Sequence, residues 1–434
     1  MRRIRFDDRD QVRELARRGS HDIELLRPGV RSLLDDVRDR GDDAIVDYHQ
    51  RFDGIELDVK QLRIGADELA ASFAALPAQL RTALEKRDDH ARWLHGQQGL
   101  TDTHIDRDGI TAGEKVQPVD AAGLYVPGGT ASFPTVMQIL AVPAAIAGVP
   151  RVVACVPPTG ASPAVLAAAH LSGVHEVYRI GGVAAIGALA YGTASVDPVN
   201  VIVGPGNAYV TAAKLEVFGQ VGIDMPAGPS EAVIIAGPEA DPRWVALDVL
   251  ARAEHDPLAA VAVVTWDGEL AARVQAEIDA ALPTFPRRDI MTAALDRYCG
   301  FVLVRNREEA VTFTVDYAPE HLEILTDDAE SYLSEIRNVG SVFLGHHTPV
   351  AVGDYLGVSG HVLPSSGYAR TFSTVSTRTF QRTTQYERIS PAALRSNLKD
   401  IMAPLAVEEG FDAHLASLEA RSAGGPAANG PVDR

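Results

Sequence analysis

A strand, a turn containing glycine or proline, and a helix follow one another repeatedly through the middle of this chain. Apolar runs that predict buried strands recur about every 25 residues, which is the pattern of βαβ units on a parallel sheet. They lie at residues 123–126, 151–156, 176–180 and 200–203. A second series begins near residue 232, with further strands predicted at 260–264, 301–304 and 341–344. The predicted fold class is therefore α/β.

Helical patterns flank this region on both sides. Residues 20–100 carry apolar side chains at helical spacing with charged side chains on the opposite face. The pattern turns helical again from residue 390. Residues 422–434 are rich in Gly, Ala and Pro, and this composition predicts a disordered tail.

Composition narrows the class of protein. A chain of 434 residues is long enough for two or three domains. Its formal net charge of -18 argues against a nucleic-acid partner, because phosphate binding favours a basic surface. Its two cysteines imply no disulfide framework and fit a reducing compartment. No secretory signal or membrane-spanning run is evident, so a soluble cytoplasmic enzyme is expected.

Two short stretches gather acid and base groups beside Gly and Pro. Glu320 and His321 are adjacent, and Asp354 and His361 follow in a second stretch. Such groups seldom gather without a reason, because buried charge is costly unless it is paired or bound to a metal. Glu320 and His321 could therefore serve as a general base pair aimed at one substrate, with Asp354 and His361 flanking the same point.

Other candidates stay open on the pattern alone. The turn Gly204-Pro205-Gly206-Asn207 follows a strand and precedes a helix, as a phosphate site would, but it lacks the third glycine of a dinucleotide-binding fingerprint. His255 ends a helix three residues after Arg252, so it could bind a ligand or the last helical carbonyls. His414 could lie on a solvated helix face. Cys155 could be a thiol nucleophile, although its valine neighbours favour a buried apolar role.

Seven motifs, taken together and in order, resemble those of the histidinol dehydrogenase family. The resemblance extends from about Arg27 to Arg421. The motifs are Gly-Leu-Tyr-Val-Pro-Gly-Gly at 123–129, Val-Gly-Pro-Gly-Asn at 203–207, Ala-Gly-Pro-Ser-Glu at 227–231, Ala-Glu-His at 253–255, Ala-Pro-Glu-His-Leu at 318–322, Gly-Asp-Tyr at 353–355 and His-Val-Leu-Pro at 361–364. No single motif would identify the family, but seven at family spacing are specific.

The resemblance implies an architecture and a chemistry. It implies two incomplete Rossmann-like domains with parallel sheets, small helical extensions at both ends and an intertwined homodimer. The expected bounds are 1–22 for the N-terminal extension, 23–121 with 231–378 for the first α/β domain, 122–230 for the second, and 379–434 for the C-terminal extension. It also implies NAD, one zinc ion per subunit, and two successive oxidations from alcohol to aldehyde to carboxylate.

Matching the motifs by position implies a role for each site residue. His321 resembles the base that takes the alcohol proton, and Glu320 resembles the group that activates water for the aldehyde step. Three zinc ligands are implied, which would also surround the substrate: His255, Asp354 and His414. Further substrate contacts are implied at Ser230, His361 and Glu409, and cofactor contacts at Tyr125 and Asn207. Arg252 and Ala184 stand at two more ligand positions and are candidates for substrate and cofactor contact, respectively. His414 and Glu409 would come from the partner subunit.

The chain departs from the family pattern at ligand positions. Arg252 stands where the family has a zinc-ligand Gln, and Ala184 where it has a Gln that contacts NAD; Asp316 and Gly360 replace common Asn residues. A guanidinium has no free lone pair and cannot ligate a cation. Zinc could therefore be held by three residues with substrate or water, Arg252 could take the metal's place, or Arg252 could grip an anionic group.

These departures leave three functional hypotheses. The first is NAD-dependent oxidation of L-histidinol to L-histidine. The second is a paralogue that oxidises a different primary alcohol, one that is anionic or handled without zinc. The third is a catalytically silent subunit that serves as a binding or scaffold protein, which the intact Glu320-His321 pair disfavours.

Overall fold

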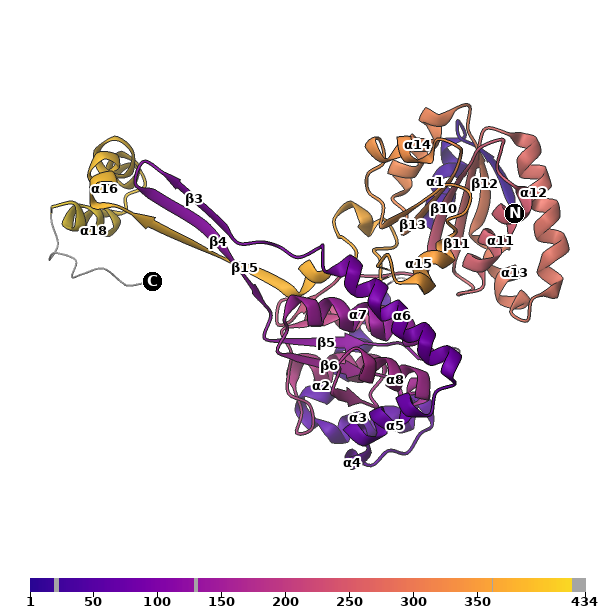
Figure 1. Cartoon of the computed structure of the whole chain (residues 1–434), viewed down its shortest axis with the longest axis horizontal. Coiled ribbons are helices and arrows are strands. Elements are labelled where there is room, and N and C mark those ends of the chain that lie inside the picture. The colour runs from indigo at the N-terminus through magenta and orange to yellow at the C-terminus, as the bar shows by residue number, and fades with distance from the viewer. Residues whose placement is uncertain (19–22, 129–131, 361, 424–434) are drawn as a thin grey trace. The chain divides into compact units, whose positions relative to one another are not determined.

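The first of two compact units in the protein holds two parallel sheets, and it comprises Met1–Gly99 and Pro118–Phe380. The computed structural model describes residues 1–18, 23–128, 132–360 and 362–423. Figure 1 shows each sheet of this unit with helices packed around it. The predicted α/β class with mainly parallel sheets is confirmed.

One sheet has six strands, and every neighbouring pair in it is parallel. In spatial order the strands are β1 (Arg2–Arg5), β12 (Cys299–Leu303), β11 (Ala260–Thr265), β10 (Glu231–Ala236), β13 (His321–Leu325) and β14 (Ser341–Leu344). One face packs against α11 (Pro242–Ala253), α12 (Gly268–Ala281) and α13 (Arg288–Arg297). The other packs against α1 (Arg9–Arg17) and α14 (Arg307–Tyr317). Both faces are thus removed from water, which explains the apolar strand sequences.

The other six-stranded sheet is built in the same way. Its order is β2 (Arg63–Ile64), β7 (Glu176–Tyr178), β6 (Arg151–Cys155), β5 (Ala121–Tyr125), β8 (Val201–Val203) and β9 (Gly222–Ile223), and only the edge pair β2–β7 is antiparallel. One face packs on α2 (Ile23–Arg40), α9 (Gly182–Tyr191) and α10 (Ala208–Val217). The opposite face packs on α5 (Ala66–Ala74), α7 (Pro134–Ala147) and α8 (Pro163–Leu171), and α6 (Ala78–His95) lies against α7.

Packing places two segments differently from the expected domain boundaries. Strand β1 pairs with β12, so part of the expected N-terminal extension of residues 1–22 belongs to a sheet. Helix α2 packs on α9 and α10, and α5 packs on α8, so residues 23–98 join the β5 sheet and not the β10 sheet with which they were grouped. An apolar helical stripe requires a partner surface, but its sequence does not specify which sheet supplies it.

The second unit comprises Leu100–Gln117 and Gln381–Arg434. It has a three-stranded sheet in the order β15 (Gln381–Ile389), β4 (Ile110–Pro118), β3 (Thr103–Arg107), followed by α16 (Pro391–Asn397), α17 (Ala403–Glu408) and α18 (Asp412–Ser422). The expectation that residues 379–434 are helical is corrected by β15. Eight of its nine residues are exposed, so no apolar alternation marked it as a strand. The expected disordered tail falls outside the described residues beyond Ala423.

Within the described ranges, no helix has the length and apolar content that crossing a membrane requires.

Candidate active site

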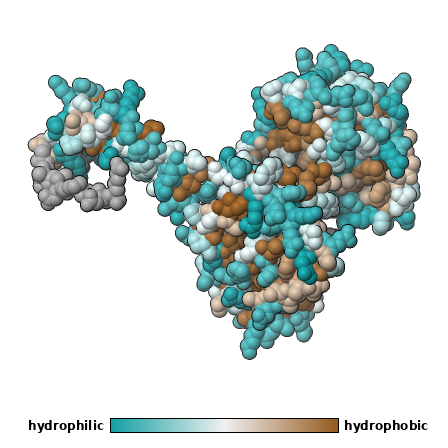
Figure 2. Space-filling view, in the orientation of Figure 1, coloured by the Kyte–Doolittle hydropathy of each residue, from teal (hydrophilic) through white to brown (hydrophobic). Residues whose placement is uncertain are grey.

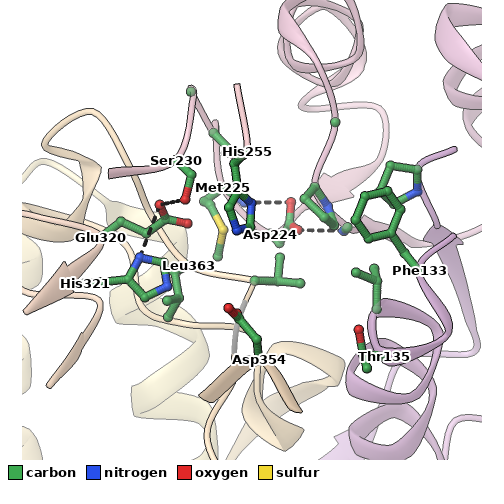
Figure 3. Close-up of a pocket in the computed structure, with 18 of the residues that line it drawn as sticks. Phe133, Thr135, Asp224, Met225, Ser230, His255, Glu320, His321, Asp354 and Leu363 are labelled. Carbon is green, nitrogen blue, oxygen red and sulfur yellow. Dashed lines mark hydrogen bonds and ion pairs between the residues drawn. The ribbon is translucent and has the colours of Figure 1, made fainter. Parts of the chain in front are cut away.

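A cavity of about 460 Å³ in the first unit collects half of the twelve site residues that the sequence singled out. Its walls include six of them: Ser230, Arg252, His255, Glu320, His321 and Asp354. Figure 3 shows Glu320 between Ser230 and His321, with His255 and Asp354 facing the same space. The structure therefore brings together side chains that are up to 124 positions apart, from Ser230 to Asp354.

The catalytic candidates lie at the amino-terminal edge of one sheet. His321 is the first residue of β13, and Ser230 directly precedes β10. The opposite wall of the cavity contains Pro127 and Gly204, which follow the carboxyl ends of β5 and β8 in the other sheet. Ligands of open α/β sheets usually bind beyond the carboxyl ends of the strands. Here one sheet follows that rule, and the other presents its amino edge to the same cavity.

Glu320 is held as a carboxylate by several donors. The Ser230 hydroxyl donates to Glu320 Oε2 over 3.0 Å, and the Glu231 backbone N–H donates to the same oxygen over 2.9 Å. His321 Nδ1 lies 3.4 Å from it. Burial alone would raise the pKa of Glu320, but the neighbouring His321 ring, the Arg252 charge and the Glu231 N–H hydrogen bond outweigh burial and lower that pKa to about 2. The side chain is therefore ionised at neutral pH.

The His321 ring is fixed in orientation. Its Nδ1 lies 3.0 Å from the Glu231 carbonyl oxygen, and the ring stacks on Phe343 with 6.0 Å between ring centroids. A carbonyl oxygen can only accept, so we assign the proton of the neutral ring to Nδ1. This assignment leaves the lone pair on Nε2, the nitrogen that a general base would use.

Arg252 belongs to the last turn of α11 and is only 4% exposed. Its Nη1 donates to Ser230 Oγ over 2.7 Å, and its Nη2 lies 3.7 Å from Asp354 Oδ2. Arg252, Ser230 and Glu320 therefore form one chain of hydrogen bonds from a fixed cation to the Glu320 carboxylate. A buried guanidinium stays charged, so Arg252 places one fixed positive charge between Ser230 and Asp354.

Asp354 and His255 complete this side of the cavity. Asp354 lies on α15 (Val350–Leu356), and its backbone carbonyl accepts a hydrogen bond from Arg87 over 3.2 Å. His255 follows α11 and keeps part of its side chain in solvent. Desolvation by the surrounding walls and repulsion from Arg252 lower the pKa of His255, so its ring is neutral at neutral pH.

The turn after β8 is organised by a buried ion pair. Lys214 and Asp224 pair with each other, with side chains 3% and 0% exposed. Asp224 accepts from the Gly204 N–H over 2.7 Å, and Lys214 donates to the Gly204 carbonyl over 3.0 Å. Gly204 itself has φ +128°, a backbone conformation that is unfavourable for every residue type except glycine. The turn Gly204–Gly206 is thus a rigid wall of the cavity.

A neighbouring cavity of about 380 Å³ adjoins this turn, and Asn207 lines it together with Gly206. The Asn207 side chain caps α10 by accepting from the N–H groups of Tyr209 and Val210, each over 3.1 Å. Of the other expected cofactor contacts, Tyr125 is 4% exposed and its hydroxyl accepts from the Gly182 N–H. Ala184 is completely buried in the core, so its side chain is closed to a cofactor.

Comparison with known proteins decides the family. The family model described as histidinol dehydrogenase matches residues 16–422. A histidinol dehydrogenase of Gluconobacter oxydans (strain 621H) is 45% identical over 418 residues, which cover 94% of this chain and 95% of that protein. One from Rhizobium meliloti (strain 1021) is 43% identical, covering 93% and 92%. The solved histidinol dehydrogenase structure from Elizabethkingia anophelis is similar with a TM-score of 0.90 at 32% identity, covering 95% of each chain.

The chain belongs to the histidinol dehydrogenase family. These matches give no support to the hypothesis of a paralogue acting on a different alcohol.

The zinc site expected from the histidinol dehydrogenase family does not fit the donors that the first unit brings to the cavity. Asp354 faces the Arg252 guanidinium, which offers no lone pair. Across the described ranges, the one group of three potential metal-binding side chains with ligand atoms within 4.8 Å of one another lies elsewhere, at Glu239, Asp327 and His346. No catalytic step is therefore derived through a metal.

Two more residues of the histidinol dehydrogenase pattern do not line this cavity. Glu409, which directly follows α17, and His414, on α18, belong to the second unit, and both are exposed. His361 lies outside the described residues. Cys155 is fully buried at the end of β6, and burial raises the pKa of its thiol to about 12, which removes it as a nucleophile.

Sequence reasoning missed the buried ion pairs that support the site, Lys214–Asp224 and Arg18–Glu231. Glu231 was visible as the last residue of the Ala-Gly-Pro-Ser-Glu motif. A carboxylate at the first position of an apolar strand could have indicated an ion pair, because a buried carboxylate requires a partner. No local pattern indicated that Arg18 would be that partner.

Proposed function

We propose that the protein oxidises L-histidinol through the aldehyde to L-histidine, with NAD accepting a hydride in each step. Membership of the histidinol dehydrogenase family supports the reaction class. The observation that supports it most is the buried Glu320–His321 pair in the cavity, with side chains 12% and 3% exposed. Such a pair supplies a proton acceptor for the alcohol step and a carboxylate that orients water for the aldehyde step.

His321 serves the alcohol step. Its Nε2 lone pair accepts the hydroxyl proton, and the resulting alkoxide releases hydride more readily than the alcohol does. The Nδ1 hydrogen bond to the Glu231 carbonyl keeps the ring in this tautomer and orientation. The products of this step are the aldehyde, NADH and a proton held on His321.

Glu320 serves the aldehyde step. An aldehyde must gain water before a second hydride can leave. The ionised Glu320 carboxylate accepts a hydrogen bond from that water, so the water oxygen turns a lone pair toward the carbonyl carbon. Ser230 and the Glu231 N–H hold the carboxylate in place. The hydrate then loses hydride and protons to become the carboxylate.

NAD supplies the hydride acceptor, and the residues beside the cavity fit such a group. The Gly204–Gly206 turn precedes the N-terminus of α10, where backbone N–H groups favour phosphate. A Cβ on Gly204 would lie 2.1 Å from the Tyr125 carbonyl oxygen, so only glycine permits this close turn. Gly206 and Asn207, which line the adjoining cavity, are the residues that would hold the cofactor.

We also propose a homodimer in which the second unit supplies Glu409 and His414 to the partner's cavity. Both residues are exposed, and the same unit exposes several large apolar side chains: Ile401, Leu405, Val407 and Phe411. Figure 2 shows hydrophobic side chains at the surface of this unit. An exposed apolar cluster of this kind favours burial against another chain. The two free buried thiols, Cys155 and Cys299, favour a cytoplasmic location.

The decisive experiment measures NADH formation from L-histidinol and, separately, from L-histidinaldehyde. His321→Asn should slow the alcohol step by roughly 100- to 10,000-fold, and Glu320→Gln should do the same to the aldehyde step. Mixing Glu320→Gln with His414→Ala should restore activity if each cavity draws on two chains. If the wild-type protein forms no NADH from either compound, the proposed function is wrong.

A further inference from the structure

The least expected residue in the cavity is Arg252, because the histidinol dehydrogenase pattern has a metal ligand at its position. Its side chain is 5% exposed, so it is not a surface charge that happens to border the cavity. Helix α11 ends one residue after it, and the guanidinium reaches both Ser230 and Asp354. These contacts determine what else this part of the cavity can accept.

Asp354 already has a cationic partner. Its Oδ2 lies 3.7 Å from Arg252 Nη2, within the range of an ion pair. A divalent cation bound to Asp354 would therefore lie close to a buried positive charge with little water to screen it, and the two cations would repel. Arg252 cannot relieve this repulsion by losing its proton, because a guanidinium stays charged in proteins.

Most N–H donors of the Arg252 guanidinium make no hydrogen bond to the described residues. Of its five N–H donors, one makes a described hydrogen bond, to Ser230. Its Nε is buried and finds no hydrogen-bond partner among the described residues. A buried donor without a partner is costly, so it favours a ligand that brings an acceptor. Arg252 thus offers what a metal would offer: a fixed positive charge directed at a lone pair.

We propose that Arg252 takes the place of the family's metal ion, so that this protein works without zinc and anchors its substrate through guanidinium hydrogen bonds. This inference rests on the proposed function, in which the substrate is histidinol, and the hydrogen-bond acceptor is then the unprotonated ring nitrogen of histidinol. Through Ser230, the same guanidinium holds the Glu320 carboxylate in position. Arg252 is accordingly both a specificity residue and a positioning residue.

The test measures bound zinc on the full-length protein. Wild type, Arg252→Gln and Arg243→Gln are stripped with a chelator, mixed with one equivalent of zinc, passed through a desalting column and analysed by mass spectrometry for metal. Arg243 is the matched control, because it lies on the same helix α11 but is exposed and lines neither cavity. Zinc titrations followed by thermal shift give a second readout that does not depend on activity.

Wild type and Arg243→Gln should retain no zinc, and Arg252→Gln should bind it roughly 10- to 100-fold more tightly. Stoichiometric zinc in the wild type would overturn the proposal. Equal zinc affinity of wild type and Arg252→Gln would overturn it too, because Arg252 would not be what excludes the metal. Wild-type NADH formation should also survive chelator. Absence of histidinol oxidation under every condition would instead refute the proposed function and leave the zinc result standing.

Discussion

Arg18 and Glu231 form an ion pair beneath the cavity, with Arg18 Nη1 3.0 Å from Glu231 Oε1 and side chains only 6% and 2% exposed. Glu231 Oε1 also accepts from the backbone N–H groups of Glu320 and Ser366, each over 3.1 Å. The Arg18 guanidinium lies 3.8 Å above the centre of the Tyr317 ring. A residue near the N-terminus thus supports the loop that carries the Glu320 carboxylate.

Arg18→Gln should therefore destabilise the protein strongly. The substitution leaves Glu231 buried without its cation, and breaking such a pair typically costs about 3–5 kcal/mol in the free energy of unfolding. Burial raises the pKa of Glu231 while Arg18 opposes that rise, so the variant should also protonate Glu231 more readily. Equilibrium denaturation in urea measures the change.

Arg13→Gln is the control for this prediction. Its pair with Asp10 is open to water, with side chains 78% and 94% exposed. An exposed pair of this kind contributes about 0–1 kcal/mol. Equal losses in the two variants would contradict the supporting role assigned to the Arg18–Glu231 pair.

The pKa of Glu320 predicts how stability responds to acid. Its ordinary value is 4.5, and the folded protein lowers it to about 2. Because the folded pKa is depressed, the group's contribution to stability is present above its unfolded value and is lost as pH falls toward the folded one. Denaturation midpoints should therefore fall more steeply from roughly pH 5 to pH 3 in wild type than in Glu320→Gln. Parallel pH profiles would refute the ionised, hydrogen-bonded state assigned to this carboxylate.

Gly204→Ala should disrupt the turn that faces the cavity. At φ +128° an added Cβ would lie 2.1 Å from the Tyr125 carbonyl oxygen, and a backbone oxygen cannot move aside cheaply. We expect a loss of about 1–3 kcal/mol from strain together with a raised KM for NAD. Gly268→Ala is the control, because a Cβ there meets nothing within 4 Å. Equal thermal stability and equal KM for NAD in the two variants would contradict the prediction.

The two cysteines should be inert in the folded protein. Cys155 and Cys299 are both fully buried, and burial raises the pKa of each thiol to about 12. A thiol-specific chromogenic reagent should label neither cysteine in native buffer and both after denaturation. Rapid labelling of Cys155 in the native protein would reopen the thiol-nucleophile hypothesis.

Eight strands of the two parallel sheets were predicted, because their burial leaves a direct mark on the sequence, whereas β2, β9 and β13 were not predicted. Runs such as 232–236 and 260–264 are apolar at every position or nearly so, since both faces of the sheet are covered. Strand β1 was missed because Arg surrounds its single buried residue, Ile4, as is usual at a sheet edge. Strand β15 was missed because water reaches nearly all of it.

The candidate pair Glu320–His321 was visible in the sequence for a different reason. Glu320 and His321 are adjacent, so their proximity needs no fold to establish it. Their partners were not visible: Ser230 lies 90 positions away from Glu320, and Arg18 lies 213 positions from Glu231. The position of Ala184 in a motif suggested cofactor contact. Whether its side chain is accessible depended on which face of α9 packs into the core.

Local patterns were enough to predict the α/β class, the family and an adjacent acid and base, because apolar periodicity and short motifs are properties of neighbouring residues. The folded chain was needed to show that Glu320 and His321 lie at the amino edge of one sheet, in a cavity that the carboxyl ends of the other sheet also line. It was also needed to show that Arg252 contacts both Ser230 and Asp354. Contacts of that kind depend on how separate helices and strands pack together. Many apolar side chains share the packing energy, and none of them specifies by its type alone which element it packs against.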